Sequence, residues 1–136
     1  MLKTWSRYLL GVLFVAAGVN HFVSPAFYVA MMPSYLPWHS QLVAVSGVAE
    51  VALGFLLLFR RWAVWAAWGL IALLVAVFPA NVQMALHPEL YPSISPTLLW
   101  LRLPLQPLLI GWAWVFTRPA RAVARRPDTR SLPPVG

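Results

Sequence analysis

Four apolar stretches, each about as long as a bilayer is thick, limit what this 136-residue chain can fold into. They cover roughly residues 5–22, 42–59, 62–86 and 98–117. A helix of about 20 apolar residues spans the hydrocarbon core, and in lipid the backbone must satisfy its own hydrogen bonds. The sequence therefore predicts an all-α fold, a four-helix transmembrane bundle within residues 1–117.

Composition agrees with a single membrane domain and excludes several kinds of chemistry. The chain is 61% hydrophobic and only 10% charged, which leaves no room for a second domain. It has no cysteine, which excludes thiol–disulfide chemistry, cysteine-ligated metals and iron–sulfur clusters. His21 is the only histidine inside an apolar stretch, because His39 and His87 lie in loops. A single histidine is a poor ligand set for a metal or haem, so we expect no metal site.

The net charge of +7 is concentrated on one side of the predicted bundle. Lysines and arginines precede the first stretch, fill the turn between the second and third, and follow the fourth, whereas loops 23–41 and 87–97 contain none. The positive-inside rule then predicts a multi-pass protein of the inner (plasma) membrane with both termini in the cytoplasm. We expect residues 118–136 to form a basic flexible cytoplasmic tail near anionic lipid, and we expect no nucleic-acid binding.

The start of the chain and the first loop each add a local signal. Lys3 and Arg7, followed by an apolar run, also fit a secretory signal peptide, although we expect a retained helix. Ser24 and Pro25 are typical of a helix N-cap and first turn. They predict a short helix over residues 26–32, lying at the outer interface of the membrane.

Small residues mark the faces on which the helices should pack. Gly11 and Gly18 are seven residues apart in the first stretch, and Gly47 and Gly54 repeat this spacing in the second. Such residues are nearly in line on a helix, and small side chains let helix backbones approach closely in lipid. The polar residues three positions after Gly18 and Gly47 should therefore face protein.

Polar residues with long side chains lie inside the stretches, where they are costly and mark functional sites by default. We expect them to meet in the outer half of the membrane or near its midplane, in a small polar pocket. Its ligand-binding residues would be Asn20, His21, Glu50, Asn81, Arg102 and Gln106.

Glu50 is the most constrained of these residues, because an isolated carboxylate at mid-membrane must neutralise or find a partner. Arg102 is the only intramembrane cation of fixed charge, so a Glu50–Arg102 ion pair is the simplest hypothesis. Two interpretations stay open. The pair could only fix helix register, or Glu50 or His21 could act as the catalytic group that exchanges a proton.

Prolines inside the third and fourth stretches, at Pro79, Pro104 and Pro107, should each remove one backbone hydrogen bond. The carbonyl of Val75, four residues before Pro79, would then need a donor from a neighbouring helix or a water-lined cavity. We expect kinks in the outer half of these helices.

Five short motifs, in order, carry a resemblance to a known family. They are Gly18-Val-Asn-His21-Phe22 with Pro25, Met32-Pro33-Ser-Tyr-Leu-Pro37, Ser46-Gly47-Val-Ala-Glu50 with Gly54, Phe78-Pro79-Ala-Asn81 with Met84, and Arg102-Leu-Pro104-Leu-Gln106. Over about residues 5–117 the chain resembles the DoxX-like family of small bacterial membrane proteins. The resemblance implies a four-helix membrane bundle with cytoplasmic termini. It also implies functional positions at His21, Glu50, Asn81, Arg102 and Gln106.

The function implied is that of an integral membrane component of a quinone-linked redox or oxidative-stress system. It would bind a quinone or another small lipophilic ligand in the outer-half pocket. No cofactor-binding fingerprint supports independent electron transfer, so the chain would be a non-autonomous oxidoreductase subunit with a partner redox enzyme. Two alternatives stay open, a non-catalytic assembly or scaffold protein with a structural Glu50–Arg102 cluster, and a small-molecule transporter acting as an oligomer. The ligand, the partner and a homo-oligomeric state are not decided by the sequence.

Overall fold

A computed structural model describes residues 1–118 of the chain, and within them the fold is all-α, as predicted. The helices in chain order are α1 (Leu2–Val23), α2 (Pro25–Ala30), α3 (His39–Leu58), α4 (Ala63–Leu86), the 3₁₀ helix η1 (Pro88–Leu90) and α5 (Pro96–Trp114). The predicted basic tail lies, apart from its first residue, outside the described residues.

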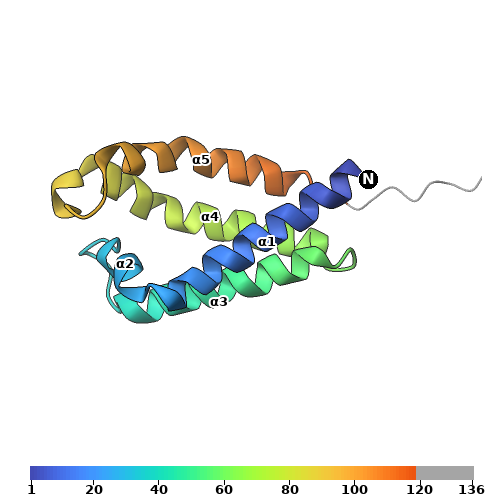
Figure 1. Ribbon diagram of the computed structural model, residues 1–136, viewed down its shortest axis with the longest axis horizontal. Helices are drawn as coiled ribbons and strands as arrows, with labels where there is room; N and C mark the ends of the chain where they lie inside the picture. Colours follow the sequence, from blue (N-terminus) through green and yellow to red (C-terminus); the bar gives the residue numbers. More distant parts are fainter. Residues whose placement is uncertain (119–136) are drawn as a thin grey trace, which may run out of the picture.

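Helices α1, α3, α4 and α5 run along the length of the molecule (Figure 1). One end carries α2, η1 and the loops beside them, and we name it the loop end. The other end combines the start of α1, the turn between α3 and α4 and the end of α5, and we name it the basic end. At the basic end the Trp112 indole nitrogen donates to the Ser6 hydroxyl at 2.7 Å and joins α5 to α1.

Three of the described helices, α1, α3 and α4, are long and apolar enough to cross a membrane, which indicates a membrane protein. The helices also present large apolar side chains outward: Trp65 is 73% exposed and Leu108 is 69% exposed. A soluble monomer rarely exposes so many large apolar side chains. Helix α5, with 19 residues, is nearly as long as α3 but less apolar, because Arg102, Gln106 and its prolines lie within it.

Helices α1 and α3 run antiparallel and touch backbone to backbone at two glycine pairs, Gly11 with Gly54 and Gly18 with Gly47, on the faces that the glycine spacing predicted. A Cβ added at Gly18 would lie 2.7 Å from the carbonyl oxygen of Gly47, and one added at Gly54 would lie 2.8 Å from that of Gly11. Burial alone supplies no attraction between helices in lipid, so close packing of this kind must hold them together. The glycines therefore define the register of α1 against α3.

Arg7 lies inside α1, whereas the sequence analysis placed it among the charges that precede the first apolar stretch. Its side chain is buried, and its Nη1 donates to the carbonyl oxygens of Leu57 at 2.8 Å and Leu58 at 3.0 Å. These carbonyls belong to the last turn of α3, which has no intrahelical donors and carries partial negative charge. Arg7 therefore caps α3 from the neighbouring helix.

Helices α4 and α5 form a second pair, and α4 also packs against α3. The main core gathers side chains from all four long helices, among them Leu10, Leu57, Leu70 and Ala113. A smaller cluster with Met31 lies at the loop end. The prolines of α4 and α5 lie within the helices without ending them.

The glycine contact predicts that Gly18→Ala destabilises the fold. The new Cβ would meet backbone atoms of α3, the Gly47 oxygen at 2.7 Å and the Val51 nitrogen at 2.8 Å, so the two helices would have to separate. Overpacking of this kind costs about 1–3 kcal/mol, which should appear as a lower thermal midpoint in detergent.

The matched control is Gly111→Ala on α5, where an added Cβ meets nothing within 4 Å. Its midpoint should stay the same or rise slightly, because alanine favours the helix. Equal losses in the two variants would contradict a specific α1–α3 contact.

Candidate functional site

His21 is buried near the loop end of α1 and is tied to α3 through its Nδ1 atom. Nδ1 lies 3.0 Å from the carbonyl oxygen of Val43 and 3.3 Å from the hydroxyl of Ser46, which itself donates to Val43. A carbonyl oxygen only accepts hydrogen bonds, so Nδ1 carries a hydrogen and donates it to Val43. This contact leaves Nε2 as the ring nitrogen available for a second contact.

Nε2 of His21 faces the carboxyl group of Glu50. The distance from Nε2 to Oε1 is 3.6 Å, and the two side chains are 9% and 16% exposed. With Nδ1 already protonated, one further proton can lie either on Nε2 or on Glu50. The pair is neutral overall in both arrangements, which lowers the cost of placing two ionisable groups inside a membrane.

The predicted Glu50–Arg102 ion pair is wrong. Within residues 1–118, the ion pairs shorter than 4.0 Å are His21–Glu50 and His87–Glu89. Arg102 instead donates from Nη1 to the sulfur of Met31 at 3.1 Å. The physical reason is helix pairing: α3 packs on α1, while α5, which carries Arg102, packs on α4.

Tyr28, on the short helix α2, completes the surroundings of His21. The two rings are stacked, with centroids 3.8 Å apart and an interplanar angle of 27°. The Tyr28 hydroxyl accepts a hydrogen bond of 2.9 Å from Nδ2 of Asn20. The structure thus places His21 beside Glu50 and joins Asn20 to this site through Tyr28. It adds Tyr28 and Ser46, which the sequence analysis missed.

Asn81 and Gln106 form a separate polar contact between α4 and α5. Nδ2 of Asn81 donates to Oε1 of Gln106 at 2.8 Å, and the Gln106 amide donates to the carbonyl of Leu74. Gln106 is only 3% exposed. The sequence analysis predicted that Pro79, inside α4, leaves the Val75 carbonyl without its helical donor. In the structure, the Gln106 amide donates to the carbonyl of the preceding residue, Leu74.

A cavity of about 150 Å³ lies beside His21, between the end of α1, α2 and the start of α3. Most of its lining is apolar, including Phe22, Val29 and Ala44. An engineered apolar cavity of about this volume in another protein binds benzene. The space beside His21 is therefore large enough for one six-membered ring.

The other acidic residue of the described chain lies apart from this site. Glu89 contacts Nδ1 of His87 at 3.0 Å, and both side chains are exposed in the loop after α4. A backbone hydrogen bond and, next, the His87 side chain lower the pKa of Glu89. Residues 1–118 contain no group of three His, Asp or Glu side chains placed to hold a metal ion.

These features define a helical membrane protein with a buried histidine–carboxylate pair. The chain belongs to the family described as a domain of unknown function, DUF8561, whose model matches residues 10–117. That range includes both glycine pairs, the His21–Glu50 pair and the whole of α5. No curated protein and no solved structure matches the chain.

The Asn81–Gln106 contact predicts that Gln106→Leu lowers the free energy of unfolding. The change leaves the Asn81 amide without its acceptor and the Leu74 carbonyl without its added donor. A buried polar group that loses its partner costs about 1–3 kcal/mol, measurable by reversible unfolding in mixed micelles.

A double-mutant cycle with Asn81→Leu isolates the contact itself. Asn81→Leu should cost less in the Gln106→Leu background than in the wild type, with a coupling above about 0.5 kcal/mol. Leu108→Ala, on the exposed side of α5, is the control and should not couple. Strict additivity of the Asn81 and Gln106 changes would argue against the contact.

Proposed function

We propose that this protein is an integral membrane component of a quinone-linked redox or oxidative-stress system, similar to the DoxX-like proteins. It would bind a quinone or a related ring-sized lipophile beside His21 and exchange one proton with it through the His21–Glu50 pair. The observation that carries this proposal is the pair itself, in which Nδ1 of His21 contacts the Val43 carbonyl and Nε2 lies 3.6 Å from the Glu50 carboxyl group.

Two features support a four-span bundle with its loop end outside the cell. Helix α5 has 19 residues, about 28 Å at 1.5 Å per residue, which is close to the thickness of the hydrocarbon core. Five of the six cations in residues 1–118 lie at the basic end, as the positive-inside rule expects of a cytoplasmic face. In this arrangement the region around α2 would lie at the outer interface and cover His21.

The chemistry proposed for the pair is proton exchange, because electrons would have to come from a partner redox enzyme. A bound ligand oxygen that gains negative charge on reduction would accept the proton. The pair would then hold Glu50 as a carboxylate beside neutral His21, and water at the loop end would restore the proton. Tyr28, stacked on the imidazole, holds the ring in place during the exchange.

A second candidate, a non-catalytic assembly protein, is favoured by one observation. Every buried side-chain nitrogen and oxygen in residues 1–118 already has a hydrogen-bond partner. The fully buried polar atoms thus have partners without any ligand, which is what a purely structural role requires. The ligand-binding test therefore has to separate loss of ligand from loss of stability.

The proposal predicts that Glu50→Gln loses a bound quinone while the protein stays folded. Removing the carboxyl group removes the partner that keeps a proton available at Nε2. Native mass spectrometry with lipid extraction should find a quinone on the wild type and at least about tenfold less on the variant, a change of about 1.4 kcal/mol in binding free energy. Glu89→Gln, the same substitution in an exposed loop, should retain the quinone.

A second variant, Ala44→Leu, separates the cavity from the pair. The larger side chain would occupy part of the space of about 150 Å³ without touching either ionisable group's chemistry. It should exclude the ligand and leave the thermal midpoint near that of the wild type. An empty wild type, together with a Glu50→Gln variant that is merely less stable, would favour the assembly protein instead.

A further inference from the structure

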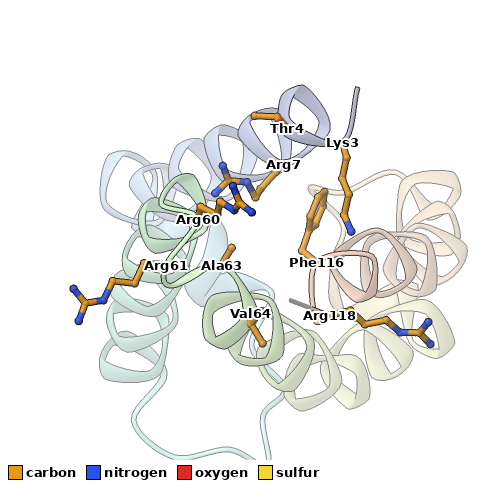
Figure 2. Close-up of a pocket in the computed structure, with 9 residues that line it drawn as sticks. All are labelled: Lys3, Thr4, Arg7, Arg60, Arg61, Ala63, Val64, Phe116 and Arg118. Carbon is orange, nitrogen blue, oxygen red and sulfur yellow. The ribbon is translucent and has the colours of Figure 1, made fainter. Parts of the chain in front are cut away.

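A second cavity of the described chain lies at the basic end, far from the His21 site. It has a volume of about 740 Å³ and lies where the first turn of α1, the α3–α4 turn and the segment after α5 meet (Figure 2). Five cationic side chains line it: Lys3, Arg7, Arg60, Arg61 and Arg118. None of the lining residues is acidic, so the cavity carries a strong positive potential.

The five cations do not all face the cavity in the same way. Figure 2 shows Lys3, Arg7 and Arg60 directed into the space between the helices, whereas Arg61 and Arg118 extend away from it. The guanidinium of Arg61 lies over the ring of Trp62, 5.4 Å from its centroid. Three charged groups therefore converge on one space, and two lie on its outer side.

Arg7 is the fixed member of the converging group. Its Nη1 is bound to the two α3 carbonyls, and its remaining N–H groups donate no hydrogen bond within residues 1–118. Lys3 and Arg60 are exposed and make no hydrogen bond or ion pair within residues 1–118. Like charges held together in this way repel each other, and an anion between them would remove that cost.

The start of α4 adds backbone donors to the same cavity. Ala63 and Val64, the first two residues of this 24-residue helix, line it, and no side chain caps the helix at Trp62. The first amides of a helix lack intrahelical acceptors and carry partial positive charge, which favours phosphate and other anions. The helix start and the cations therefore attract the same kind of ligand.

An apolar wall adjoins the charged groups. Phe116, Ala63 and Val64 contribute it, beside the outward-facing apolar surfaces of the helices. A phosphate ion alone would gain nothing from this wall, whereas a phospholipid carries acyl chains next to its phosphate. We propose that the basic cavity binds the phosphate group of an anionic phospholipid, with Lys3 and Arg60 contacting it and Arg7 positioned at its base.

The experiment uses the full chain in dodecyl maltoside and measures the apparent Kd of the first bound lipid by native mass spectrometry. The probes are dioleoylphosphatidylglycerol, dioleoylglycerol with the same acyl chains but no phosphate, and inorganic phosphate. The test variant is Lys3→Gln/Arg60→Gln, and the control is Arg61→Gln/Arg118→Gln, which loses the same charge from side chains that point away.

The wild type should prefer phosphatidylglycerol to dioleoylglycerol, and inorganic phosphate should not displace it. The test variant should weaken phosphatidylglycerol binding roughly ten- to thirtyfold, and the control by less than about threefold. If the double variant unfolds, Lys3→Gln alone should weaken binding by about fivefold.

Three results would overturn the proposal. Equal weakening in the test and control variants would mean that the charges act only as a diffuse field. Equal binding of dioleoylglycerol would show that the phosphate is not recognised. Displacement of the lipid by millimolar inorganic phosphate would assign the cavity to a soluble phosphate ligand.

Discussion

The close backbone contact between α1 and α3 determines the rest of the arrangement. Gly11 against Gly54 and Gly18 against Gly47 bring the two antiparallel helices together in one register. That register places Nδ1 of His21 on the carbonyl of Val43 at one end. A larger residue at either glycine pair would separate the helices and move these polar contacts out of reach.

The register also explains why one charged residue is used structurally and another remains available for chemistry. Arg7 is held at the last turn of α3, where it offsets the partial charge of orphan carbonyls. Glu50 has no such backbone partner, and its carboxyl group lies 3.6 Å from Nε2 of His21 instead. The second helix pair, α4 and α5, is joined by its own polar contact through Gln106.

Much of the fold follows from local patterns in the sequence, whereas the pairing of polar groups does not. The apolar stretches, the glycine spacing and Pro25 predict long helices, a tight helix contact and the short helix α2. The predicted partner of Glu50 was wrong. Charge complementarity suggested Arg102, whereas the pairing of α3 with α1 places Glu50 beside His21. Ser46, four residues before Glu50, could have been found from helical spacing, but the stacking of Tyr28 on His21 depends on how α2 folds back.

The deciding measurement is ¹⁵N NMR of histidine-labelled protein in lipid bilayers, with the His21 signals assigned by their loss in His21→Asn. Nδ1 of His21 should carry a hydrogen in the wild type and in both variants below, because it donates to the Val43 carbonyl. Glu50→Gln should shift the Nε2 resonance, and Arg102→Gln should leave it unchanged, because Arg102 contacts Met31 instead. A resonance that responds to Arg102→Gln and not to Glu50→Gln would contradict the histidine–carboxylate pair.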